Sequence, residues 1–248
     1  MTPADALMVL GAGTIAGAVN VVAGGGTLIT FPALLAAGLS PVAANITSSV
    51  GLLAGYAGGS LAYRQELEGQ RGRAKGLAVA GVIGGVAGAV LLLLTPGDSF
   101  RAVVPFLILL SCLLLAIQPR VAAWLKGRGA DHPAWQAQLA IGVAAVYGSY
   151  FGAGLGVIVL AVLGLLIADE LQRLNALKGA LSLVINLAGV AVFLATGSVH
   201  WLAALLLAVG AFVGATFGVR LARRLPGQAV RVFVVLAGLV VAVVLLTT

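Results

Sequence analysis

Apolar residues run along almost the whole chain in long segments that short polar breaks separate. These segments cover residues 5–22, 27–38, 42–63, 76–94, 100–118, 136–152, 155–167, 176–195, 201–219 and 230–247. Many of them approach the length of about 20 apolar residues that a helix needs to cross a bilayer. The pattern predicts an all-α polytopic membrane protein.

Residues 4–39 form one apolar run that is too long for a single membrane helix. A continuous helix of this length would measure about 54 Å, against a hydrocarbon core of about 30 Å. Gly24, Gly25, Gly26 and Thr27 interrupt the run, and glycine permits the dihedral angles of a sharp reversal. We therefore expect a hairpin of two helices over residues 5–38. Close helix packing at small residues is the alternative explanation for these glycines.

Composition excludes a soluble domain. Hydrophobic residues make up 61% of the chain, charged residues 8%, and the mean hydropathy is +1.16. The net charge of +7 does not indicate a nucleic-acid partner, because the basic residues lie in short loops between apolar segments. A single cysteine, Cys112, excludes a disulfide framework and a multi-cysteine metal site. We expect no cofactor and no metal, and we expect the first apolar run to be a membrane element rather than a cleaved signal.

An internal repeat divides the chain into two halves. An ungapped shift of 130 residues pairs Asn45 with Asn175, Gly59 with Gly189 and Arg101 with Arg231. The shift also pairs Gly24, Gly26, Gly84, Gly88 and Pro96-Gly97 with Gly154, Gly156, Gly214, Gly218 and Pro226-Gly227. We expect a first repeat at 1–118 (hairpin 5–38, spans 42–63, 76–94, 100–118), a cytoplasmic linker at 119–135, and a second repeat at 136–248 (hairpin 136–167, spans 176–195, 201–219, 230–247).

Counting the membrane crossings predicts that the two repeats are inverted. A broken-helix hairpin followed by three transmembrane helices crosses an odd number of times, so the second repeat begins on the opposite side. With the linker in the cytoplasm, 13 of the 14 basic residues lie on the cytoplasmic side and only Arg101 lies outside, as the positive-inside rule requires. We expect a multi-pass protein of the plasma (inner) membrane with both termini extracytoplasmic.

The two glycine breaks are expected to approach each other near mid-membrane, where irregular backbone is tolerated only if it lines a cavity. Helix starts with amide or hydroxyl side chains favour an anion there. The candidate substrate-binding residues are Asn20, Gly24, Gly25, Gly26, Thr27, Asn45, Thr47, Ser48, Tyr150, Gly154, Gly156, Asn175 and Lys178. Two alternatives stay open: Asn45 and Asn175 can be helix N-caps, and Lys178 can snorkel to the cytoplasmic surface.

Four stretches flank the two breaks: residues 17–32 (GAVNVVAGGGTLITFP), 43–49, 148–156 and 173–178. Together they resemble the sulfite exporter TauE/SafE family of membrane transporters. The resemblance implies a secondary transporter for a small organic or sulfur-containing anion of the sulfite, sulfonate or carboxylate type, with proton coupling as an option. The implied partners are the anionic substrate and the lipid bilayer, and a homodimer stays open. Residues 45–48 depart from the Gly-Thr-Ser-like stretch that we expect there, so the substrate is not fixed.

An anion channel is the main alternative, because asparagine and threonine side chains with open carbonyls also conduct ions. An integral-membrane enzyme acting on a lipid phosphate would need acids, bases or metal ligands at the hairpin tips. The hairpins carry no such cluster, since Asp5 lies at one end and Asp169, Glu170 and His200 lie in loops. We therefore expect no catalytic residues, and alternating access around a mid-membrane site.

Overall fold

The computed structural model describes residues 1–22, 24–62, 64–125, 132–195, 199–222 and 227–247. In this part of the chain ten α-helices follow one another and no strand occurs, which confirms the predicted all-α class. The helices are α1 (Pro3–Val22), α2 (Thr27–Ala36), α3 (Pro41–Ala62), α4 (Arg71–Leu94), α5 (Gly97–Leu125), α6 (Ala134–Tyr150), α7 (Leu155–Leu166), α8 (Leu171–Leu194), α9 (Trp201–Ala222) and α10 (Gly227–Thr247). Ala23 in the first break, residues 126–131 of the expected linker, and the connections 196–198 and 223–226 lie outside the described residues.

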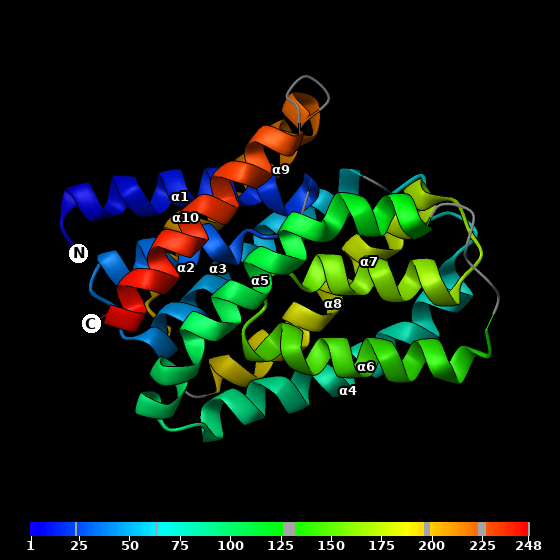
Figure 1. Ribbon diagram of the computed structural model, residues 1–248, viewed down its shortest axis with the longest axis horizontal. Coiled ribbons are helices and arrows are strands. Elements are labelled where there is room, and N and C mark those ends of the chain that lie inside the picture. The colour runs from blue at the N-terminus through cyan, green and yellow to red at the C-terminus, as the bar shows by residue number, and fades with distance from the viewer. Residues whose placement is uncertain (23, 63, 126–131, 196–198, 223–226, 248) are drawn as a thin grey trace.

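Helix lengths separate full spans from half-length helices. Within the described residues, α4, α5 and α8 are long and apolar enough to cross a membrane. The helices α2 and α7 have only 10 and 12 residues, or about 15 and 18 Å. Each packs against the longer helix that precedes it, α1 or α6. The two long apolar runs are therefore broken into helix pairs, and the N- and C-terminal ends lie at the same end of the molecule (Figure 1).

Several helices extend beyond the apolar segments that the sequence marks. Helix α4 begins at Arg71 rather than at 76, and α8 begins at Leu171 rather than at 176. Helix α5 continues through Pro119 to Leu125, into the region expected to be linker. Hydropathy locates the part of a helix that lies in hydrocarbon, whereas polar ends of the same helix reach into the interface.

The helix boundaries follow the repeat. Helices α3, α4 and α5 begin at 41, 71 and 97, and α8, α9 and α10 begin at 171, 201 and 227, which is an offset of 130 each time. The packing pairs also exchange between halves: α1 packs against α9 as α6 packs against α4, and α3 packs against α9 as α8 packs against α4. This crosswise packing is the arrangement that a two-fold relation between the halves would produce. The inversion of the repeats across a membrane stays a prediction.

Glycines bring the backbones of the crosswise pairs into contact. A Cβ atom added to Gly17 would collide with the Ala211 carbonyl, and one added to Gly214 with the Thr14 carbonyl. On the other pair, Gly84 and Gly88 face backbone of α6 in the same way. Small residues are the usual means of close helix packing in lipid, because the surrounding hydrocarbon removes most of the hydrophobic driving force.

Substituting Gly17 with alanine should lower stability, because the new methyl group has no space against α9. We expect a loss of about 1 to 3 kcal/mol in the free energy of unfolding, measured in mild detergent. Gly11→Ala is the matched control on the same helix, since a Cβ at Gly11 meets nothing within 4 Å. Equal stabilities of the two variants would contradict the packing described for α1 and α9.

Candidate functional site

Both helix breaks turn at glycines with left-handed backbone conformations. The φ angles are 77° at Gly24, 83° at Gly152 and 81° at Gly154, which residues with a side chain rarely adopt. The two breaks also touch, because a Cβ atom on Gly24 would lie 3.0 Å from the Cα atom of Gly156. The glycine breaks from the two halves therefore meet through their backbones, inside a core of helices.

Asn20 organises the first break with one side of its amide. Its Oδ1 atom accepts a 2.7 Å hydrogen bond from the Gly26 N–H group, across the reversal of the chain. A Cβ atom on Gly26 would lie 2.7 Å from the same side chain, so Gly26 has to be a glycine for this bond to form. The Nδ2 atom of Asn20 is buried and has no hydrogen-bond partner among the described residues.

The backbone of the second break is hydrogen-bonded by side chains from three helices. The Ala153 carbonyl accepts from the Tyr147 hydroxyl at 2.6 Å and from the Ser111 hydroxyl at 2.9 Å. The Nδ2 atom of Asn45 donates to the Tyr150 carbonyl at 2.9 Å, and the Asn45 side chain is fully buried. Asn45 therefore fastens α3 to the end of α6.

Several other predicted site residues have structural contacts and do not line the cavity described below. The Thr47 hydroxyl accepts from the His200 N–H group at 3.1 Å, and the Ser48 hydroxyl pairs with Thr30. The Tyr150 ring packs edge-on against Phe100. The remaining predicted residues belong to the breaks themselves: Thr27 is buried in the first turn of α2, Gly25 faces Leu115, and Gly154 precedes α7.

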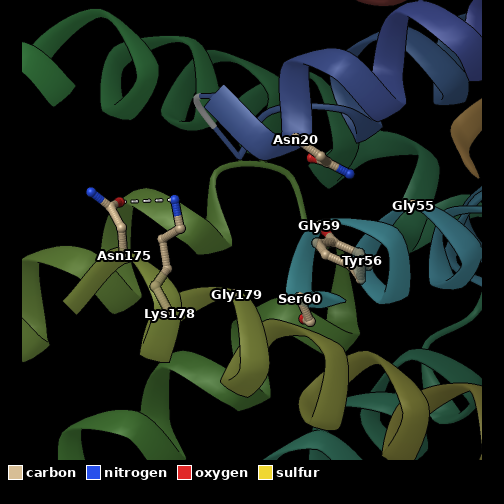
Figure 2. A pocket seen from close by; sticks show the side chains of 8 residues that line it. All are labelled: Asn20, Gly55, Tyr56, Gly59, Ser60, Asn175, Lys178 and Gly179. Atoms are coloured by element: carbon tan, nitrogen blue, oxygen red, sulfur yellow. Dashed lines mark hydrogen bonds between the residues drawn. The ribbon is translucent and has the colours of Figure 1, made fainter. Parts of the chain in front are cut away.

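A cavity with an empty volume of about 370 Å³ lies between α1, α3 and α8. Figure 2 shows the side chains that line it: Asn20, Gly55, Tyr56, Gly59, Ser60, Asn175, Lys178 and Gly179. Asn20, Asn175 and Lys178 are among the predicted site residues. Tyr56, Ser60 and the three glycines were not, although the repeat pairs Gly59 with Gly189 and Tyr56 with Asn186.

Lys178 is the cation of this cavity. Its side chain is 6% exposed, and its Nζ atom donates to Oδ1 of Asn175 at 3.3 Å (Figure 2). In the part of the chain that the structure describes, both ion pairs belong to Asp169, with Arg73 and Arg173, so neither includes Lys178. None of the described residues that line the cavity is acidic.

Two further polar groups in the cavity are buried without a hydrogen-bond partner among the described residues. They are Nδ2 of Asn20 and the hydroxyl of Ser60. The Tyr56 hydroxyl lies near the amide side chains of Asn20 and Asn186. Burying polar atoms without hydrogen bonds costs free energy. The lining therefore combines one cation with two donors that have no partner among the described residues, a set of groups that can bind a small anion.

The structure does not agree with the two alternative explanations for the polar residues of α3 and α8, which are helix N-capping and snorkelling. Helix α3 begins at Pro41 and α8 begins at Leu171, so Asn45 and Asn175 lie inside helices and are not N-caps. Glu170 occupies the N-cap position of α8. Lys178 also lies well inside α8 and its side chain is buried in the cavity, so it does not snorkel to the surface.

Two broken helix pairs whose breaks meet beside a buried cationic cavity, within a multi-pass helical protein, define a membrane transporter. The model of the sulfite exporter TauE/SafE family matches residues 9–245, and the chain belongs to this family. The protein is therefore a membrane transporter rather than an enzyme.

Three relatives, each named a probable membrane transporter protein, align with most of this chain. The chain is 29% identical to the probable membrane transporter protein ORF9 of Sinorhizobium sp., over 94% of this chain and 88% of that protein. It is 27% identical to the probable membrane transporter protein YfcA of Escherichia coli K12, over 94% and 86%. A probable membrane transporter protein of Haemophilus influenzae is 26% identical, over 84% and 82%. No solved structure matches the chain.

Asn45→Ala and Asn175→Ala should have different effects on stability. Removing Asn45 leaves the Tyr150 carbonyl without its side-chain donor in a buried site, so the free energy of unfolding should fall by about 1 to 3 kcal/mol. Asn175 lines an open cavity, and its removal should cost clearly less. Denaturation of both variants in the same detergent tests this difference. Equal losses would show that Asn45 does not fasten the second break.

Proposed function

We propose that this protein is a secondary transporter that moves a small organic or sulfur-containing anion across the plasma membrane by alternating access. The observation that carries the proposal is the buried side chain of Lys178, which has no acidic partner among the described residues that line the cavity. An isolated buried charge is costly in a protein interior, and more so in a membrane. An anion that binds beside Lys178 removes this cost.

The shape and chemistry of the cavity favour a small oxyanion. The cavity leaves about 30 Å³ for the centres of water-sized molecules, and one water needs about 10 to 15 Å³ by this measure, so the cavity admits only a compact group. Asn20 and Ser60 offer neutral hydrogen-bond donors, which add to the charge of Lys178. Sulfite, sulfonates and carboxylates all present a compact group of oxygens that such donors can bind.

Lys178→Met should abolish substrate binding while leaving the fold intact. Loss of a buried charge partner costs about 2 kcal/mol or more, so affinity should fall by at least about 30-fold. The measurement is titration of the purified protein with a panel of sulfite, sulfonates and carboxylates, followed by uptake of the tightest binder into vesicles.

Lys75→Gln is the matched control for this experiment. It also removes one lysine charge, but Lys75 is exposed near the start of α4. The control should bind the anion as the wild type does. The thermal unfolding temperature of Lys178→Met should be unchanged or higher, because an uncompensated buried charge has been removed. Unchanged affinity in a folded Lys178→Met protein would refute the proposed site.

An asymmetry between the halves supports alternating access. The 130-residue shift pairs Asn45 with Asn175 and Tyr150 with Asn20. Asn45 donates a hydrogen bond to the Tyr150 carbonyl, whereas Asn175 accepts one from Lys178 and lines the cavity. In our proposal the two asparagines exchange these roles in the opposite-facing state. Asn175 then forms a hydrogen bond with the backbone of Asn20, and the hydrogen bond from Asn45 to Tyr150 is broken.

The cavity lies toward the end of the molecule that carries the charged loops. Ser60 is close to the end of α3, just before the loop 64–70, and Lys178 lies in the first third of α8. Arg73, Arg173 and Asp169 form the ion pairs at this end. Under the positive-inside rule this end is cytoplasmic. In our proposal the structure is therefore the state that opens toward the cytoplasm.

In this proposal Lys178 also accounts for proton coupling. A protonated lysine and a monovalent anion together carry no net charge, which lowers the cost of moving the loaded site. Once the anion leaves, the isolated lysine can release its proton on the same side. One proton then moves with each anion, and the cycle is electroneutral.

The rate of uptake into vesicles should therefore depend on the pH gradient and not on the membrane potential. Acidifying the side from which the anion enters should accelerate uptake, and a potassium diffusion potential should leave the initial rate unchanged. A rate that depends on the potential but not on the pH gradient would contradict coupling through Lys178. Flux that does not saturate with anion concentration would instead support the channel alternative.

A further inference from the structure

A second polar cavity lies between the end of α5 and the start of α10, at the surface of the helix bundle. Its empty volume is about 1120 Å³, and Arg120, Arg231 and Gln228 line it together with apolar side chains. Among the described residues, the lining includes two arginines and no acidic side chain. We propose that this cavity binds the headgroup phosphate of an anionic phospholipid.

The guanidinium group of Arg231 is only partly used by the protein. Its Nη2 atom donates to Oε1 of Gln118 at 3.3 Å. Its Nε atom is buried and has no hydrogen-bond partner among the described residues. Gln118 is itself buried, at 6% exposure, so it holds one side of the guanidinium in place. The Nε donor is thus left without an acceptor among the described residues, and arginine binds phosphate oxygens in a bidentate manner.

The surroundings favour a lipid over a free phosphate ion. Large apolar side chains lead away from the arginines along both helices and are exposed, among them Leu113, Val232 and Leu236. Val232 and Leu236 also line the cavity. A free phosphate would contact only the charged rim, whereas a phospholipid would place its phosphate on the arginines and its acyl chains on the apolar side chains.

The depth of the two arginines agrees with this assignment. Arg231 lies about one turn after the start of α10 at Gly227, and Arg120 lies about one turn before the end of α5 at Leu125. Both therefore lie near the ends of membrane helices, at the level of the headgroups. Basic pockets between membrane helices bind anionic headgroups in this way. This inference does not depend on the transported substrate.

Native mass spectrometry of the full-length protein in detergent tests the site. The probes are cardiolipin, phosphatidylglycerol and phosphatidylcholine with matched acyl chains, and inorganic phosphate in a separate arm. We expect one anionic lipid to stay bound under conditions that remove phosphatidylcholine. Arg120→Gln and Arg231→Gln should each weaken this binding about fivefold, since each basic side chain near the surface contributes about 1 kcal/mol.

Arg101→Gln is the matched control. The repeat pairs Arg101 with Arg231, but Arg101 is exposed near the start of α5, away from the cavity. This variant should bind lipid as the wild type does. Arg120 is exposed, so its replacement keeps the test valid even if Arg231→Gln fails to fold. Equal effects of all three substitutions, equal retention of phosphatidylcholine, or retention of inorganic phosphate in place of lipid would each overturn the proposal.

Discussion

Backbone that leaves a helix inside a membrane must be enclosed by protein, because hydrocarbon offers no hydrogen bonds. The breaks after α1 and α6 meet this requirement through the crosswise packing of the two halves. Helix α9 covers α1 and α4 covers α6, and glycines at Gly17, Gly84 and Gly214 bring the backbones together. Neither half encloses its own break, so each broken helix depends on the other half of the chain.

Within this enclosure, hydrogen bonding separates the structural breaks from the site. At the second break the Ala153 carbonyl accepts from Tyr147 and Ser111, and the Tyr150 carbonyl accepts from Asn45, whose Oδ1 atom has no partner among the described residues. Where α1, α3 and α8 meet, the hydrogen-bond pairing of polar side chains is less complete. Oδ1 of Asn20 accepts from the Gly26 N–H group, whereas Nδ2 of Asn20 and the Ser60 hydroxyl have no hydrogen-bond partner among the described residues. Unpaired groups beside the cation of Lys178 are a poor way to stabilise a fold, which is why we interpret them as a binding site.

The sequence predicted the helix pairs, the breaks and the repeat because each of these depends on local features: apolar length, glycine and a fixed offset. It could not separate the polar residues that line the cavity from those that hold the backbone, because that depends on which face of a helix meets which neighbour. Asn45 and Asn175 have equivalent positions in the repeat, yet one holds the Tyr150 carbonyl and the other faces the cavity. Ser60 carries no motif at all, and only its place opposite α8 identifies it. The repeat did contain one usable signal, since Tyr56 corresponds to Asn186 and both lie close together in the structure.

The repeat also bears on the charge of the substrate in the proposed mechanism. The 130-residue shift pairs Lys178 with Ser48, so one half contributes a cation and the other a neutral hydroxyl, which is bonded to Thr30. Two buried lysines at equivalent positions would double the cost of burying charge in the membrane. A single lysine can neutralise one negative charge, and neutral donors from Asn20 and Ser60 can bind further oxygens without adding charge. The proposed site is therefore matched to a monovalent anion with several oxygens, such as hydrogen sulfite, a sulfonate or a carboxylate, and divalent sulfite would carry an unbalanced charge through the membrane.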